Sequence, residues 1–69
     1  MSSYKDLNVY NFSIEFVTEI YEITKKFPSE EKFGLTSQIR RAAVSIPSNI
    51  AEGAMRQSTK EFIQFLYIS

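Results

Sequence analysis

The spacing of the apolar residues constrains the fold most, because it repeats every three or four residues through most of the 69-residue chain. Residues three and four apart lie on one face of an α-helix. The first run lies between Asn8 and Phe27 and contains Val9, Phe12, Phe16, Ile20, Ile23 and Phe27. The second run contains Leu35, Ile39, Ala42, Ile46, Ile50 and Gly53. The pattern predicts an all-α protein with two long helices.

Proline and glycine mark where these helices are expected to end. Pro28 has no N–H and disfavours helical backbone at the residue before it, so it is expected to stop the first helix. Glu22 and Lys26 fit an i,i+4 ion pair near that end. Ser29, followed by two glutamates, fits a capped helix start. Gly34 interrupts that start, so we expect only a single helical turn there.

Pro47 lies inside the second apolar run. An interior proline costs about 3 kcal/mol in a helix, and local rules alone break the helix at Ile46 and restart it at Ser48. The apolar spacing nevertheless continues through Pro47 without a change of phase. This continuity favours one kinked helix over two separate ones. The sequence therefore predicts a helix from about Leu35 past Gly53, bent near Pro47.

A third helix is predicted from Ser58. Ser58 and Glu61 match the S-x-x-E capping box, and a mostly apolar segment follows in which the sequence ends. We therefore expect residues 1–69 to form a single domain, the N-terminal part of an antiparallel up-down four-helix bundle and an incomplete folding unit by itself. In that arrangement the apolar faces of the first two helices pack together and pair Phe12, Phe16, Ile20 and Ile23 with Leu35, Ile39, Ala42 and Ile46. The third helix is then only partly covered, at Phe62, Phe65 and Leu66.

The composition excludes several classes of function but does not assign one. The 8 basic and 8 acidic residues give a net charge of zero, and the chain has no His and no Cys. The commonest metal ligand and the usual proton shuttle at neutral pH are therefore missing. Glu15, Glu19 and Glu22 share a helix face, but carboxylate metal sites in bundles also use a histidine. The start of the chain does not fit a signal peptide, and no apolar run approaches the ~20 residues that span a bilayer. We expect a cytoplasmic, non-catalytic protein without a cofactor, metal, membrane or small-molecule substrate.

The segment from Lys25 to Leu66 closely resembles a known bacterial protein family. The most specific string runs from Gly34 to Pro47 and continues from Asn49 to Gly53. It is similar to the four-helix-bundle proteins encoded in the intervening sequences of 23S ribosomal RNA genes, which also occur as free-standing genes. The resemblance implies an antiparallel four-helix bundle that assembles into a pentameric ring. A related group, the accessory variability proteins of diversity-generating retroelements, works with a reverse transcriptase and binds nucleic acid through a basic surface.

Two groups of residues are candidates for a site. Residues 34–60 carry four basic side chains against one acid, and these four are the candidates for contact with nucleic-acid phosphates: Arg40, Arg41, Arg56 and Lys60. The alternative is that these side chains form solvated helix surface or ion pairs. Adjacent residues on a helix point about 100° apart, so Arg40 and Arg41 are expected to have different roles, one near a neighbouring helix or subunit and the other in solvent. The second group is the polar part of the family motif: Asn49, Glu52 and Gly53. Its members fit either a pocket beside the proline or ordinary helix surface with a Glu52–Arg56 ion pair.

These observations lead to two function hypotheses. The first is a non-catalytic helical-bundle protein that acts through self-association. The second is an accessory protein that contacts RNA or DNA phosphates, or a reverse-transcriptase-like partner, through its basic helical surface. Salt separates the two, because binding by counterion release weakens steeply with salt and apolar self-association does not.

Overall fold

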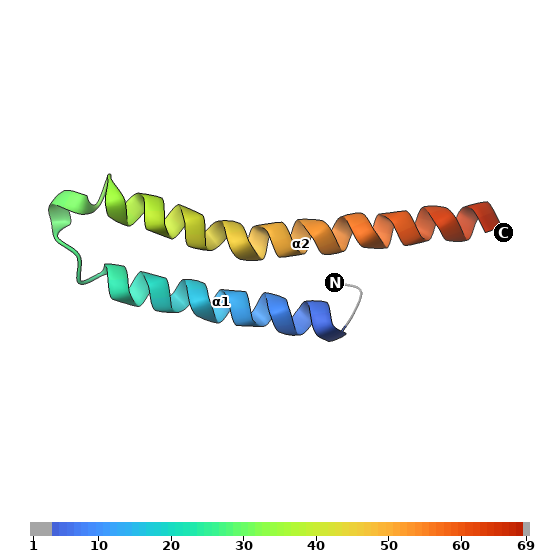
Figure 1. The fold of residues 1–69 in the computed structure, drawn as a ribbon, viewed down its shortest axis with the longest axis horizontal. Coiled ribbons are helices and arrows are strands. Elements are labelled where there is room, and N and C mark those ends of the chain that lie inside the picture. The colour runs from blue at the N-terminus through green and yellow to red at the C-terminus, as the bar shows by residue number, and fades with distance from the viewer. Residues whose placement is uncertain (1–3, 69) are drawn as a thin grey trace.

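The computed structural model describes residues 4–68, and the chain forms an extended helical hairpin. Helix α1 (Tyr4–Thr24) is followed by a short 3-10 turn, η1 (Ser29–Glu31), and by the long helix α2 (Leu35–Ile68). The two long helices lie side by side and run antiparallel (Figure 1). No strand occurs among the described residues. The predictions of an all-α fold and of antiparallel packing are confirmed.

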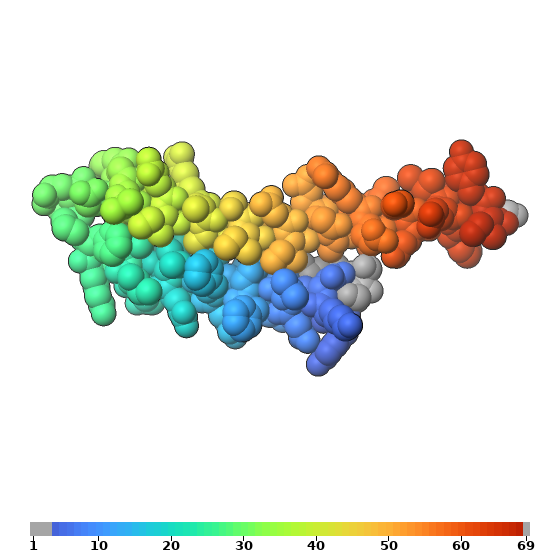
Figure 2. All heavy atoms as spheres, viewed as in Figure 1, coloured from blue at the N-terminus to red at the C-terminus, as the bar shows by residue number. Residues whose placement is uncertain are grey.

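The hairpin is a single layer of two helices. Its Cα atoms span 59 × 21 × 7 Å, and the radius of gyration is 16.9 Å, whereas a compact domain of this length has about 11 Å. The accessible surface is 5800 Å², against about 4,500 Å² for a compact protein of 8.0 kDa. About 1,300 Å² more surface is therefore exposed than in a compact fold. Figure 2 shows that the C-terminal part of α2 extends well beyond α1.

Helix α2 continues through Pro47, as the apolar phase predicts. Two serine hydroxyls bond back to the backbone on either side of the proline: Ser45 Oγ donates to Ala42 O at 2.6 Å and Ser48 Oγ to Val44 O at 3.0 Å. The ribbon bows gently here instead of breaking (Figure 1). Serine hydroxyls that bond back to the helix backbone often bend a helix, which agrees with the gentle bow.

The predicted third helix is wrong, because α2 runs without interruption from Leu35 to Ile68. Ser58 has helical backbone, so it cannot act as an N-cap, which requires a non-helical conformation. Within the supposed boundary, Thr59 Oγ1 donates to Met55 O and Gln57 Nε2 donates to Glu61 Oε1, both at 3.0 Å. No Gly or Pro follows Gly53, so nothing in the sequence stops the helix. The described chain therefore contains two long helices and not the start of a third.

The connection between the helices differs from the prediction in detail. Helix α1 ends at Thr24, before the expected stop, and the turn closes with the Lys25 N–H donating to Tyr21 O at 3.1 Å. Glu22 pairs with Lys25 at 2.9 Å and not with Lys26 as predicted; both lysines follow the end of α1. The single helical turn after Pro28 is confirmed as η1, without a side-chain cap.

The contact line between α1 and α2 consists mainly of small and hydroxyl-bearing residues. Part of the predicted apolar pairing is present, but along one side of this line, where Phe16, Ile20, Ile39 and Ile46 line a common hollow. The buried residues are Ser13 and Thr24 on α1 and Thr36, Ala43, Pro47 and Ala54 on α2. Buried hydroxyls are costly unless bonded, and here Ser13 Oγ donates to Tyr10 O at 2.6 Å and Thr24 Oγ1 to Ile20 O at 2.7 Å. Small side chains at this line let the two helices approach closely.

Candidate functional site

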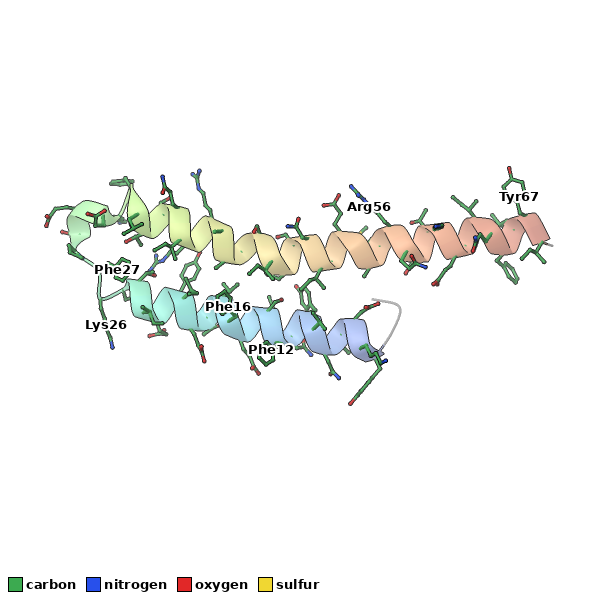
Figure 3. All side chains as sticks on the ribbon, viewed as in Figure 1. Phe12, Phe16, Lys26, Phe27, Arg56 and Tyr67 are labelled. Atoms are coloured by element: carbon green, nitrogen blue, oxygen red, sulfur yellow. The ribbon has the colours of Figure 1, made fainter. Side chains whose placement is uncertain are left out.

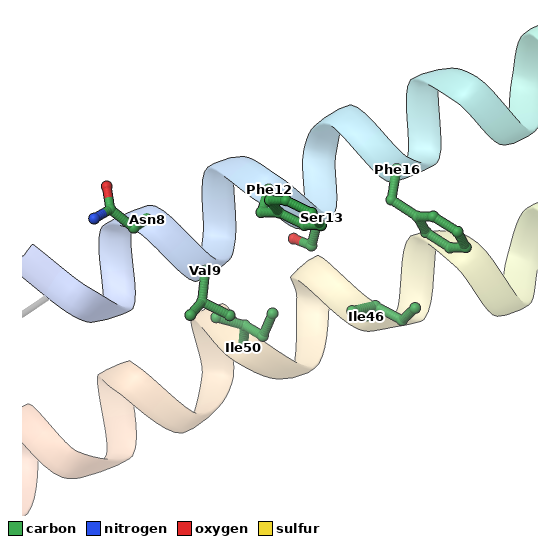
Figure 4. A pocket seen from close by; sticks show the side chains of 7 residues that line it. All are labelled: Asn8, Val9, Phe12, Ser13, Phe16, Ile46 and Ile50. Atoms are coloured by element: carbon green, nitrogen blue, oxygen red, sulfur yellow. The ribbon is translucent and has the colours of Figure 1, made fainter.

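The large apolar side chains line an open groove on one broad face of the hairpin. The groove has a volume of about 520 Å³ and is lined by Asn8, Val9, Phe12, Ser13, Phe16, Ile46 and Ile50; we call it the apolar groove. Val9 lies next to Ile50, and Phe16 lies next to Ile46 (Figure 4). A second hollow shares Phe16 and Ile46 and extends the groove toward Ile20 and Ile39.

Helix geometry explains why this face is open. On α2, the predicted apolar stripe through Ile39 and Ile46 lies about a quarter turn around the helix from Ala43 and Pro47, which face α1. The stripe on α1 is offset from Ser13 toward the same broad face. The two stripes therefore flank the contact line and face outward together.

The chemistry of the apolar groove suits an apolar partner. Its lining contains no charged side chain, and Phe12 is 74% and Val9 54% exposed. Burying one such side chain fully is worth ~1.5–3 kcal/mol. Grooves between two helices are typical docking sites for the apolar face of another helix.

Arg40, one of the predicted phosphate contacts, binds the other helix of its own hairpin. Its Nε donates to Thr24 Oγ1 at 2.8 Å and its Nη2 donates to Tyr21 O at 3.4 Å. The guanidinium also lies 4.4 Å from the centre of the Tyr21 ring. A cation at the C-terminal end of α1 complements the helix dipole as well. Arg40 therefore fastens α2 to α1.

The neighbouring Arg41 is exposed and forms no hydrogen bond or ion pair with residues 4–68. The prediction that the two arginines do different jobs is thus confirmed. Arg56 is also exposed and points away from α1 (Figure 3), and Lys60 lies one turn further along. Arg41 and Arg56 are about 22 Å apart along the helix. The structure thus gives an elongated basic face and not a compact patch.

A comparison with known protein families shows which family this chain belongs to. The sequence matches the family described as 23S rRNA-intervening sequence protein over residues 5–69. The chain belongs to this family. Searches of the curated proteins and of the solved structures gave no match. The resemblance drawn from the Gly34–Pro47 string is therefore confirmed as family membership.

In this 23S rRNA-intervening sequence protein, the polar motif residues lie on the exposed surface of α2. The predicted Glu52–Arg56 ion pair is present, with 2.5 Å between Oε1 and Nη2. Glu52 and Arg56 share a shallow hollow with Lys60, but Asn49 and Gly53 do not line it. A Cβ added at Gly53 meets no atom within 4 Å. The motif is therefore split between an ion pair and open surface, and does not form a pocket.

One surface hollow of this family member was missed from sequence. It lies at the start of α2 and is lined by Lys32, Phe33 and Arg41 among others. Phe33 is 92% exposed, and the Lys32 ammonium lies 5.8 Å from its ring centre. The sequence did contain a signal for this hollow. Phe33 lies between Lys32 and Gly34 in a polar connection, and a connection of this kind runs over the surface, so its phenylalanine was to be expected on the surface and not in a core.

Two other kinds of site do not occur in the part of the chain that the structure describes. Among residues 4–68 no group of three His, Cys, Asp or Glu side chains is placed to hold a metal ion. Within the same residues, neither helix is both long and apolar enough to cross a membrane.

Proposed function

We propose that this 23S rRNA-intervening sequence protein is a non-catalytic, self-associating helical protein and that the apolar groove is its association surface. The observation that carries this proposal is the open groove, in which large apolar side chains lie exposed with no charged residue among them. Contiguous exposed apolar surface of this kind is typical of protein–protein contacts.

The exposed area is large enough for a stable contact. A standard interface removes about 800 Å² from each partner, and the hairpin exposes about 1,300 Å² more than a compact protein of its mass. The zero net charge adds no long-range repulsion between copies.

Sedimentation and light scattering over a range of protein concentrations test this proposal. We expect an assembly larger than the 8.0 kDa chain, with little change in its affinity as salt is raised. Phe12→Asp, in the groove, is expected to dissociate it. Phe33→Asp is the matched control, because Phe33 is exposed but lies outside the groove. A wild-type chain that stays monomeric at every concentration contradicts the proposal.

We also propose a second candidate function, the binding of RNA or DNA phosphates by the exposed basic face of α2. The observation in its favour is that Arg41, Arg56 and Lys60 are all exposed, with Glu52 as the one acid between Arg41 and Lys60. Arg40 is bound to α1 and Arg56 is paired with Glu52, so Arg41 and Lys60 offer about two phosphate contacts without breaking an interaction. Two contacts give a log–log salt slope of about −1.4 to −1.8.

Binding of the protein to ribosomal RNA fragments at several salt concentrations tests this candidate. Arg41→Ala is expected to weaken binding uniformly and to reduce the slope by about 1. Lys26→Ala is the control, because Lys26 lies at the opposite side of the connection between the helices and points away from α2 (Figure 3). Affinity that does not change with salt excludes this function.

A further inference from the structure

The hollow at the start of α2 combines cations, hydroxyls and an exposed aromatic ring. It has a volume of about 570 Å³, and we call it the basic hollow. Its lining contains Lys32, Arg40 and Arg41, and no acidic side chain of the described chain takes part in it. Apart from Phe33, most of the remaining lining residues carry a hydroxyl. The basic hollow is therefore positively charged, although the whole chain has no net charge.

The basic hollow and the apolar groove lie on opposite broad faces of the hairpin. Ile46 lines the groove and Val44 lines the basic hollow, and residues two apart on a helix point about 160° away from each other. A further helix of a bundle packs with its apolar stripe against apolar side chains, which the groove provides. A helix on the groove therefore leaves the cations of the basic hollow accessible.

The basic hollow has free donors for an anion. Lys32 and Arg41 are exposed, and neither forms a hydrogen bond or ion pair with residues 4–68. Thr36, which also lines the hollow, is only 5% exposed, and its hydroxyl has no hydrogen-bond partner in the same part of the chain. Since no fully covered side-chain oxygen there lacks a partner, the Thr36 oxygen remains accessible. Two cations and a hydroxyl at one hollow suit a phosphate group.

Phe33 adds a flat apolar surface beside these donors. The residue is 92% exposed, and the Lys32 ammonium lies 5.8 Å from the centre of its ring. A phosphate alone gains nothing from a phenyl ring, whereas an unpaired base stacks on it. The bases of a duplex already stack on one another and are not free to do so. A ring next to cations therefore favours a single strand over a duplex.

We infer that the basic hollow binds one unpaired nucleotide of a single-stranded nucleic acid, with its base on Phe33 and its phosphate at Lys32 and Arg41. This inference rests on the proposed binding of nucleic-acid phosphates and adds the class of nucleic acid and the place where a base is held. Arg41 belongs both to the basic hollow and to the basic face of α2. A strand bound in the hollow can thus continue along α2 toward Arg56 and Lys60.

Fluorescence anisotropy of a labelled single-stranded oligonucleotide, titrated with the full chain at several salt concentrations, tests the inference. Phe33→Ala is expected to weaken binding about 5- to 150-fold and to leave the salt slope unchanged, because stacking releases no counterion. Lys32→Ala is expected to reduce the slope by about 0.7, the value for one phosphate contact of a single strand. Lys26→Ala is the control for Lys32→Ala, because Lys26 points away from α2 (Figure 3).

Two conservative variants separate stacking from a loss of apolar volume. Phe33→Tyr keeps an aromatic ring and is expected to bind like the wild type. Phe33→Leu keeps an apolar side chain without a ring and is expected to bind as weakly as Phe33→Ala. All of these variants are expected to melt at the wild-type Tm, because Phe33 is exposed in a connection; a lower Tm would place the ring in a core and overturn the inference.

A duplex of the same sequence and a free nucleoside monophosphate complete the experiment. We expect the duplex to bind more weakly than the single strand and to be insensitive to Phe33→Ala. We expect the monophosphate to compete only weakly, because it lacks the neighbouring phosphates that the basic face contacts.

The outcomes separate this inference from the proposed function. A chain that binds no nucleic acid overturns both. Equal binding of single strand and duplex, unchanged by Phe33→Ala, keeps phosphate binding and overturns the basic hollow as a nucleotide site. A monophosphate that binds as tightly as the strand, or a change in assembled mass caused by Phe33→Ala, overturns it too, since the hollow then serves a small ligand or another subunit. A loss confined to the variants without a ring, at constant salt slope, supports the inference.

Discussion

Replacing Arg40 by alanine tests the contact that fastens the two helices. The substitution removes the 2.8 Å hydrogen bond from Nε to Thr24 Oγ1, the longer one to Tyr21 O and the contact with the Tyr21 ring. Thr24 is buried, and its hydroxyl donates to Ile20 O while it accepts from Arg40. Without the guanidinium, a buried oxygen loses its donor.

The expected loss of stability follows from these interactions. A hydrogen bond to a charged group contributes about 1.5–3 kcal/mol, and a cation–π contact at a partly exposed site adds about 0.5–1 kcal/mol. Because Arg40 is only half-buried, we take the lower end, about 2 kcal/mol. For a domain of this size that corresponds to a fall in Tm of about 8–16 °C.

Arg41→Ala is a matched control, since it makes the same change one residue away where the side chain forms no hydrogen bond or ion pair with the described chain. It is expected to change the free energy of unfolding by less than about 0.5 kcal/mol. Thermal and urea unfolding at one fixed protein concentration measure both variants. A double-mutant cycle with Thr24→Val should give a coupling of about 1 kcal/mol. If Arg40→Ala is as mild as Arg41→Ala, or the coupling is zero, the assignment of Arg40 to the helix contact is refuted.

Three further substitutions in α2 have defined expectations, each measured by thermal unfolding. Gly53→Ala should raise stability by about 0.5–1 kcal/mol, because the helix gains a better former and the new Cβ meets open space; a loss would show that another chain packs against this position. Ser58→Ala should be nearly neutral, since replacing a true N-cap costs about 0.5–2 kcal/mol and Ser58 lies inside a helix. Pro47→Ala should raise both helix content by circular dichroism and stability by about 1–2 kcal/mol, because the ~3 kcal/mol cost of the interior proline exceeds the stabilisation that its buried ring provides; destabilisation would mean that the bowed shape is required.

The helices and their antiparallel pairing were predictable because their signals are local and repeated. Apolar residues at helical spacing mark each helix, and Pro28 marks the connection between them. Pro47 shows that a repeated signal outweighs a single adverse residue, since the phase on both sides of it is unchanged. The family was predictable for a related reason, because the string from Gly34 to Pro47 is long and specific.

The boundary at Ser58 was predicted wrongly because a capping box is not sufficient evidence for a helix start. The same Ser-x-x-Glu spacing is compatible with a helix interior, where the serine bonds backward or faces solvent. A true start also needs residues before it that leave the helical conformation, and the segment from Ala54 to Gln57 contains none that favour this. A capping box without a preceding breaker therefore should not divide a long helix.

The contact line was missed for a deeper physical reason, which also bears on function. The predicted core took the largest apolar side chains as the contact between neighbouring helices. In a two-helix layer, the residues at the closest approach have the least room, and there the chain places alanine, serine, threonine and proline. Phe16, Ile46 and their neighbours lie beside this line, where they stabilise little until a further element covers them.

The spacing of the small residues on α2 could have revealed the contact line, because seven, four and seven positions separate Thr36, Ala43, Pro47 and Ala54. A helix with one line of small residues and another of large ones, about a quarter turn apart, carries two contact surfaces. In this chain the first joins the hairpin, and the second is the surface from which its association is expected.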